Sequence, residues 1–220
     1  MKSYVDSKNL IQKTEQWLDE VSRLNRDSLI PVSDKTALLI IDMQNYFLLP
    51  GAPAYLEAGE AIIANVKKLL DLFRQLKRPV IFTRHVHKPD GSDAGIMAWW
   101  WGGMCLEDSD ESRIHELLKP LSDEKVIAKH RYSAFYNTDL ETVLRCMKIE
   151  DLIVSGVMTN LCCESTARDA YFRDYRVFFP VDATATTIEE MHRASLINLA
   201  YGFASITSVG RLTEQLEEQG

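Results

Sequence analysis

The stretch ALLIID, residues 37–42, is a continuous apolar run that ends on the carboxylate of Asp42. Five more short apolar runs follow along the chain: PVIFT at 79–83, KVIA at 125–128, DLIVS at 151–155, VFFPV at 177–181 and ASIT at 204–207. Runs that stay apolar without alternating are typical of parallel strands covered on both faces. The six runs therefore predict the strands of a buried parallel sheet.

Amphipathic segments separate most of these runs and predict helices. Residues 57–77 repeat apolar side chains at helical spacing, and residues 138–147 open with Thr138 and Glu141, the two ends of a Thr-x-x-Glu capping box. Further helices are predicted at 161–173, 188–201 and 212–218. Strand, helix and strand in succession predict right-handed crossovers and an α/β fold, a three-layer α/β/α sandwich.

Two segments lie outside this alternation. Residues 6–24 read as an amphipathic helix before the first strand, packed on the outside of the domain or on another subunit. We therefore expect an N-terminal helical extension over residues 1–30 and one domain over residues 31–220. Residues 88–110 hold three consecutive tryptophans (99–101) and four glycines, and they predict a long loop that serves as a lid or an interface.

Composition limits the possible partners. Of 220 residues, 46% are hydrophobic and 26% charged, as in a soluble globular domain, and the net charge of -7 argues against nucleic-acid binding. No apolar run is long enough to cross a membrane, and the N-terminus lacks the apolar core of a signal peptide. Four irregularly spaced cysteines make no disulfide framework. We expect a cytoplasmic protein that binds neither nucleic acid nor membrane.

Three reactive side chains fall at the carboxyl ends of predicted strands, the edge where parallel sheets bind ligands: Asp42, Lys129 and Cys162. Taken singly, an aspartate caps a turn, a lysine reaches solvent and a cysteine fills apolar space. Together they predict a nucleophilic site, in which Lys129 and a helix start lower the pKa of the Cys162 thiol and Asp42 carries its proton to a departing amine. Neighbours on a helix point about 100° apart, so only one of Cys162 and Cys163 faces such a site, and this geometry alone leaves the choice open.

Residues 34–209 resemble the isochorismatase-like cysteine hydrolase family, which includes nicotinamidases, N-carbamoylsarcosine amidases and related amidohydrolases. The resemblance is carried by ALLIIDMQNYF (37–47), KHRYSAFYNTDLETVLR (129–145), GVMTNLCCESTARDA (156–170) and VDATAT (181–186), in that order. It implies a six-stranded parallel sheet in doubly wound order and a homo-oligomer, either a dimer or a tetramer.

The same resemblance implies the roles of individual residues. Cys162 is the nucleophile and Cys163 packs, Asp42 is the acid and base, and Lys129 is the cation. A cis peptide between Val157 and Met158 is expected, with the amides of Met158 and Cys162 forming an oxyanion hole. The expected substrate-binding residues are Gln44, Phe47, Tyr132, Phe135 and Trp100.

The chain departs from the nicotinamidase pattern after the second strand. Nicotinamidases have an Asp-x-His pair there and a later histidine, which together hold a metal, whereas this chain has His85 in place of the aspartate and His87 at the first histidine. Two imidazoles can bind zinc or simply line a pocket. Since the sequence offers no evident third ligand, nicotinamidase activity is disfavoured and neither a metal nor a cofactor is expected.

The expected function is therefore the cysteine-dependent hydrolysis of a small amide, ureido or carbamoyl compound through a thioester, which releases ammonia or an amine. Two alternatives remain open. Vinyl-ether hydrolysis of an isochorismate-type substrate would depend on Asp42 without needing Cys162. A binding or scaffold protein on the same fold would use the tryptophan loop for docking, because fold alone does not decide function.

Overall fold

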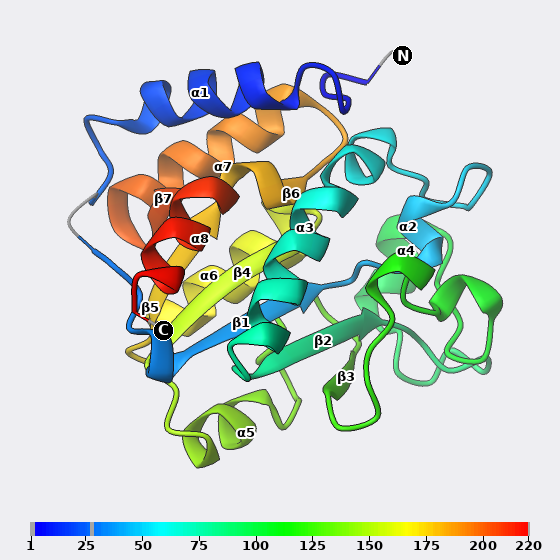
Figure 1. Ribbon diagram of the computed structural model, residues 1–220. Coiled ribbons are helices and arrows are strands. Elements are labelled where there is room, and N and C mark those ends of the chain that lie inside the picture. The colour runs from blue at the N-terminus through cyan, green and yellow to red at the C-terminus, as the bar shows by residue number, and fades with distance from the viewer. Residues whose placement is uncertain (1–2, 27–28, 220) are drawn as a thin grey trace.

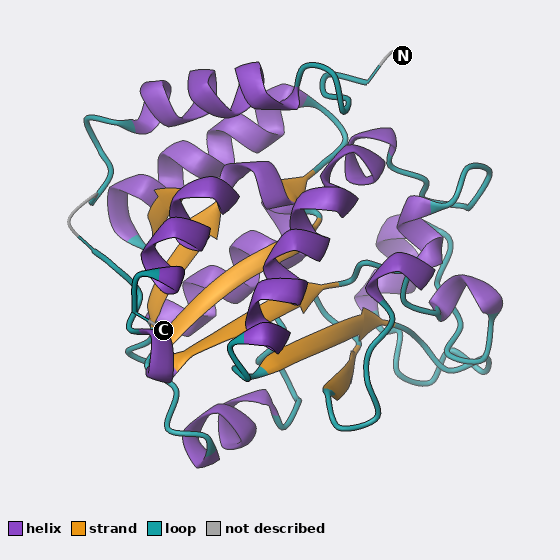
Figure 2. Ribbon diagram, viewed as in Figure 1, coloured by secondary structure: helices purple, strands orange, loops and turns teal. Residues whose placement is uncertain are grey.

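A parallel sheet forms the centre of the computed structural model, which describes residues 3–26 and 29–219 (Figures 1 and 2). The strands are β1 (Thr36–Ile41), β2 (Val80–His85), β3 (Lys125–Lys129), β4 (Asp151–Val157), β5 (Arg176–Pro180), β6 (Thr184–Ala185) and β7 (Ser205–Thr207). They pair in the order β3-β2-β1-β4-β5-β7, with β6 pairing on β4, and every pairing is parallel. The predicted six-stranded, doubly wound sheet is confirmed, and the two-residue β6 is an addition too short to form an apolar run.

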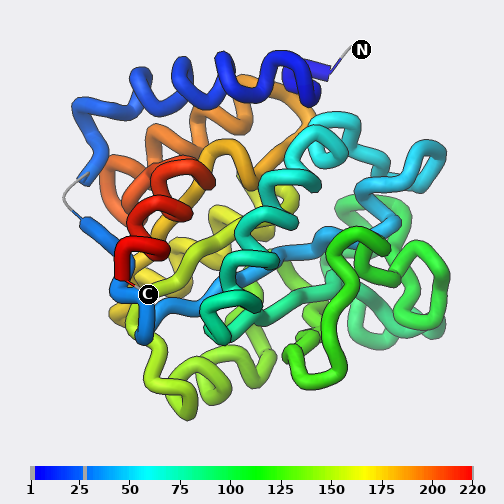
Figure 3. Tube along the Cα trace, viewed as in Figure 1, coloured from blue at the N-terminus to red at the C-terminus, as the bar shows by residue number. Residues whose placement is uncertain are grey.

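Helices cover both faces of the sheet and complete the three-layer α/β/α sandwich. They are α1 (Leu10–Val21), α2 (Asn45–Leu48), α3 (Glu57–Gln75), α4 (Ile96–Trp101), α5 (Leu140–Cys146), α6 (Glu164–Tyr171), α7 (Glu189–Gly202) and α8 (Val209–Glu217). In Figure 1, α3 and α8 lie in front of the sheet and α6 lies behind it. Helix α1 packs across α7, so the N-terminal part of the chain runs over the top of the molecule (Figure 3). Within the described residues, no helix combines the length and apolarity that crossing a membrane requires.

Two predicted helices and the predicted long loop differ from what is observed in their details. The helix predicted from residue 161 is preceded by a turn of π-helix, Thr159–Cys163, and α6 begins at Glu164. At the start of α5 the Thr138 hydroxyl accepts a hydrogen bond from the backbone amide of Leu140, at 3.2 Å, and not from that of Glu141. The expected capping box therefore does not form. The segment 88–110 holds α4, which carries the three tryptophans, and is therefore not loop throughout.

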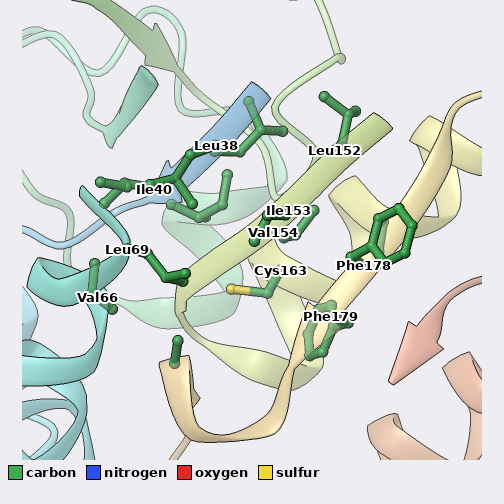
Figure 4. Close-up of a cluster of buried hydrophobic side chains, with 14 of the residues drawn as sticks. Leu38, Ile40, Val66, Leu69, Leu152, Ile153, Val154, Cys163, Phe178 and Phe179 are labelled. Carbon is green, nitrogen blue, oxygen red and sulfur yellow. The ribbon is translucent and has the colours of Figure 1, made fainter. Parts of the chain in front are cut away.

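The core lies between the sheet and its two helix layers. Every residue of β1 and of β4 is buried, which explains why both read as unbroken apolar runs. Figure 4 shows Cys163 in the cluster that contains Val154 and Phe179, and Cys163 has no exposed surface. Of the two adjacent cysteines, Cys163 thus faces the core.

Gly156 brings β1 and β4 unusually close at the end where the reactive residues gather. Its φ is +113°, and a Cβ at this position would lie 2.0 Å from the carbonyl oxygen of its partner Ile41. A side chain here is therefore excluded both by backbone conformation and by space.

We expect Gly156→Ala to lower the free energy of unfolding by about 3 kcal/mol or more, because a backbone atom rather than a flexible side chain blocks the added methyl. Gly202→Ala is the matched control: a Cβ on this helical glycine meets nothing within 4 Å, so its effect should stay within about 1 kcal/mol. Urea unfolding followed by circular dichroism measures both changes. Equal effects of the two substitutions would contradict the close approach.

Candidate active site

Four neighbouring strands deliver one polar side chain each to the same edge of the sheet. Asp42 follows β1, His85 ends β2, Lys129 ends β3, and Cys162 lies in the turn Thr159–Cys163 after β4. Because β3, β2, β1 and β4 are adjacent and parallel, their carboxyl ends share an edge, and the strand order reverses between β1 and β4. The three residues expected from the sequence therefore converge, and His85 joins them.

The ammonium of Lys129 is the centre of this cluster and has no exposed surface. Its Nζ lies 2.7 Å from Asp42 Oδ2, 3.2 Å from Cys162 Sγ, 3.2 Å from His85 Nδ1 and 3.0 Å from the carbonyl oxygen of Arg131. An ammonium has three N–H donors. Four groups therefore compete for three protons, and the sulfur is the weakest acceptor among them.

The carboxylate of Asp42 is fixed from two sides. The hydroxyl of Thr83 donates to Oδ1 at 2.6 Å, while Oδ2 faces the ammonium. The backbone of Asp42 has a φ of +50°, and its amide donates to the same Thr83 hydroxyl at 3.1 Å. A carboxylate oxygen and the Cys162 sulfur lie within 4.8 Å of each other. The carboxylate and the sulfur thus lie side by side against the same Lys129 ammonium.

Burial, more than the nearby cation, sets the protonation of these groups. Desolvation raises the pKa of Cys162 to about 12, and the Lys129 ammonium opposes this rise without reversing it. Desolvation lowers the pKa of Lys129, but the charges of Asp42 and Cys162 outweigh it and the net pKa is raised. The expectation of a lowered cysteine pKa is therefore wrong for the resting protein, where the sulfur is a thiol and the amine an ammonium.

A directional hydrogen-bond chain leads away from Lys129 along β2. Because the ammonium only donates, His85 Nδ1 must accept, which places the His85 proton on Nε2. That proton points to His87 Nε2 at 3.2 Å, and His87 Nδ1 then donates to Asp93 Oδ1 at 3.2 Å. Desolvation lowers the pKa of both histidines, so both imidazoles are neutral and their tautomers are set by this chain.

Two groups of side chains in this region have the composition of a metal site. Asp42, His85 and Cys162 form the first group, but the Lys129 ammonium contacts all three and fills the space a metal would need, so this group does not fit one.

The second group, His87, Asp93 and His130, offers three ligand atoms within 4.8 Å of one another, a set that suits zinc. The expectation that His87 lacks further ligands is therefore wrong. Asp93 lies six positions beyond His87 and His130 directly follows Lys129, but nothing in the sequence pattern joins them.

A cavity of about 170 Å³ opens above the Cys162 sulfur. Its walls are mainly apolar or aromatic, and they include the expected Phe47 and Tyr132 together with Trp101, Met97, Met104 and Leu161. The tryptophan expected here was Trp100. The structure instead brings Trp101 to the wall, where its Nε1 donates to the Tyr132 hydroxyl at 3.0 Å, while Trp100 faces a neighbouring depression.

Two other expected substrate-binding residues lie away from this cavity. Gln44 is buried beneath it, where its side-chain oxygen accepts the amide of His85 at 2.7 Å and its nitrogen donates to the Ser112 carbonyl at 3.1 Å. Phe135 stacks on Tyr175, with ring centroids 6.0 Å apart. Gln44 therefore holds the end of β2 in place, and Phe135 belongs to the packing behind the site.

We expect the alkylation of Cys162 by iodoacetamide to rise about tenfold per pH unit from pH 7 to 10 without levelling, because the thiolate fraction grows at that rate below the pKa. The experiment uses the Cys163→Ala protein, so that labelling of the peptide that contains residue 162 reports on Cys162 alone. The labelling rate of the exposed Cys146 in the same digest is the internal control for the reagent. Mass spectrometry of the labelled peptides gives both rates. A plateau below pH 8 would contradict a raised cysteine pKa.

Comparison with known proteins places the chain in a family. The isochorismatase domain model matches residues 36–210. Nicotinamidase 3 of Arabidopsis thaliana is 41% identical over 84% of this chain and 91% of its own length. Isochorismatase of Bacillus subtilis is 32% identical over 88% of this chain and 62% of its own length.

Among solved structures, a cysteine hydrolase from Pseudomonas syringae pv. phaseolicola superposes with a TM-score of 0.84 at 30% identity, and the match covers 89% of this chain and all of the other. The resemblance drawn from the motifs is thereby confirmed. The fold, the matched domain and these relatives agree, and the protein belongs to the isochorismatase family of hydrolases.

Proposed function

We propose that the protein hydrolyses a small neutral amide through a thioester on Cys162. The observation that carries this proposal is the cluster at the cavity floor, where the Cys162 sulfur lies 3.2 Å from the Lys129 ammonium and beside the Asp42 carboxylate. A thiol, a base and a cation in mutual contact have the composition of an activated nucleophile. Cys162 also lines the cavity, whereas Cys163 faces the core.

In the first half-reaction, Asp42 takes the thiol proton as the sulfur attacks the amide carbonyl carbon. Among the residues that the structure describes, none accepts a backbone hydrogen bond from the amide of Met158, and this amide together with that of Cys162 donates to the developing oxyanion. The peptide between Val157 and Met158 is cis, at the expected position. Asp42 then returns the proton to the nitrogen, and the C–N bond breaks to release ammonia or an amine.

In the second half-reaction, water attacks the thioester carbonyl and Asp42 takes a proton from that water. The C–S bond breaks, an acid is released, and the sulfur recovers the proton from Asp42. Lys129 donates to the sulfur whenever it carries negative charge, because its ammonium already lies within hydrogen-bond distance. The thiol proton thus leaves with the ammonia or amine, a proton from water replaces it on the sulfur, and Asp42 carries both.

The cavity walls indicate the class of substrate. No lysine or arginine is among the described residues that line the cavity, and its two histidines are neutral. A carboxylate on the substrate would therefore be buried without a cationic partner, which is costly. The small volume and the aromatic walls favour a compact, planar, uncharged amide. Nicotinamide has these properties, and the plant relative named Nicotinamidase 3 makes it a first substrate to test.

Vinyl-ether hydrolysis, the activity indicated by the name of the Bacillus subtilis relative, is less well supported. An isochorismate-type substrate carries carboxylates, and the cavity has no cationic wall to receive them. That reaction would also leave the thiol of Cys162 without a use. A scaffold role is disfavoured for a similar reason, because docking would not require an ammonium buried against a thiol and a carboxylate.

We further propose that the protein is a cytoplasmic homo-oligomer, a dimer or a tetramer. The side chains of Trp99 and Trp100 on α4 are 74% and 64% exposed beside the cavity, and such aromatic surface is enriched at protein interfaces.

We expect Cys162→Ala to lower kcat for any amide that the wild type cleaves by about 1000-fold or more, because the acyl group then has no acceptor. Cys163→Ala should keep kcat within about threefold, since it removes only one small core side chain, and it serves as the control. Ammonia release from nicotinamide, benzamide and N-carbamoyl compounds measures both. Comparable activity of the two variants would exclude Cys162 as the nucleophile.

We expect Lys129→Met to lower the free energy of unfolding by about 3–5 kcal/mol, because it leaves the Asp42 carboxylate buried without its cation. The double variant Lys129→Met/Asp42→Asn removes both charges and should be about 2 kcal/mol more stable than Lys129→Met alone. Urea unfolding at pH 7 gives the comparison. If the double variant is no more stable than Lys129→Met alone, the pair does not interact as described.

A further inference from the structure

The N-terminal segment, residues 3–24, packs closely on the domain although it lies outside the matched family region. Helix α1 runs across α7 (Figure 1). Trp17 is only 2% exposed, and its Nε1 donates to Glu189 Oε1 at 2.9 Å. Lys13 pairs with the same carboxylate at 2.9 Å. A tryptophan buried this completely, with its one donor satisfied, is a specific anchor rather than a loose cover.

One route from this segment leads to the turn Thr159–Cys163, hereafter the nucleophile turn. The Trp17 ring packs on the His192 ring of α7, with centroids 4.4 Å apart. His192 has no exposed surface, and burial lowers its pKa to about 3, so the ring is neutral. Its Nδ1 is hydrogen-bonded to the Thr159 hydroxyl at 2.9 Å. Trp17 therefore fixes the ring that holds the first residue of the nucleophile turn.

A second route reaches the next residue of the same turn. The hydroxyl of Tyr4 accepts a hydrogen bond from the backbone amide of Thr186 at 3.2 Å. The Thr186 side chain then donates to Asn160 Oδ1 at 2.6 Å. Tyr4 also lies 6.2 Å from Trp17 and 6.1 Å from His192, measured between ring centroids, so the two routes support each other. Two consecutive residues of the turn are thus held, through one intermediate residue each, by the N-terminal segment.

We infer that the N-terminal segment positions the nucleophile, with Tyr4 and Trp17 acting as positioning residues through Thr186 and His192. The inference rests on the proposed role of Cys162. A turn of π-helix is rare, and the side-chain contacts at Thr159 and Asn160 add to the backbone hydrogen bonds of this one, such as that from the Cys163 amide to the Met158 carbonyl at 3.1 Å. Catalytic geometry tolerates shifts of only about 0.5 Å. Thr159 and Asn160 stand three and two positions before Cys162, and displacing either one moves the sulfur relative to the Lys129 ammonium.

The alternative is that α1 merely covers apolar surface. Its removal would then lower stability and leave the folded enzyme unchanged. Val21 separates the two explanations because it is buried on the same helix, 1% exposed, four positions beyond Trp17, and has no aromatic ring to pack on that of His192. If α1 positions the nucleophile, removing the Trp17 ring from His192 lowers catalysis, whereas weakening the packing of α1 at Val21 does not.

The test compares Trp17→Ala, Trp17→Phe and Val21→Ala in the full chain, well below their unfolding temperatures. We expect Trp17→Ala to lower kcat for the cleaved amide about tenfold with KM within twofold, because most of the cavity wall lies outside the nucleophile turn while the sulfur is misplaced. Trp17→Phe keeps a ring against His192 and should recover most of kcat. Val21→Ala should lower the unfolding midpoint but keep kcat within twofold. Tyr4→Phe, which removes only the hydroxyl, should lower kcat about threefold.

A readout that needs no substrate keeps this test separate from the proposed function. The rate of Cys162 alkylation by iodoacetamide at pH 9, measured in the Cys163→Ala background, should fall in Trp17→Ala and stay unchanged in Val21→Ala. If Cys162→Ala retains amidase activity, the proposed function fails, and the alkylation rates still decide whether the segment controls the sulfur. A folded Trp17→Ala protein with wild-type kcat and wild-type alkylation would overturn the inference.

Discussion

The buried ammonium of Lys129 is the constraint on which the site and the sheet both depend. A fully buried charge is tolerated only when it is paired and hydrogen-bonded. Its partners come from the ends of three other strands: Asp42 follows β1, His85 ends β2 and Cys162 lies in the turn after β4, while Lys129 itself ends β3. The ammonium is satisfied only when β3, β2, β1 and β4 lie side by side with their carboxyl ends aligned. The same strand order that builds the sheet therefore also brings together the residues of the site.

The same cluster explains how a thiol with a raised pKa can act as a nucleophile. Ionising Cys162 by release of a proton to solvent would add a second negative charge to a buried site, and burial opposes this. Moving the proton from the sulfur to Asp42 leaves the total charge of the cluster unchanged. The low dielectric therefore penalises that internal transfer far less, and Lys129 remains in contact with whichever partner carries the charge.

The sequence predicts the elements of this protein better than it predicts the contacts between them. Unbroken apolar runs identify strands because both faces of the sheet are covered, and residues at strand ends then share an edge by topology. Contacts within irregular segments have no such rule. Trp101 rather than Trp100 lines the cavity because α4 is a short helix between Gly95 and Gly102, whose direction no periodicity reveals. Similarly, Asp93 and His130 meet only because a loop returns to the end of β3.

The N-terminal segment lies outside the matched domain and still reaches the residues that hold the nucleophile turn. Its ion pairs, Lys13 with Glu189 and Glu20 with Arg193, are partly exposed and contribute little to docking. Burial of apolar side chains supplies most of the docking energy, since fully burying a large one stabilises by about 1.5–3 kcal/mol, and Val5, Leu10, Trp17 and Val21 are all buried. Trp17 is the member of this set that packs on the His192 ring. Docking of the segment therefore rests on several side chains, whereas the position of the nucleophile turn depends on Trp17 among them, so a substitution such as Val21→Ala weakens docking without moving the turn.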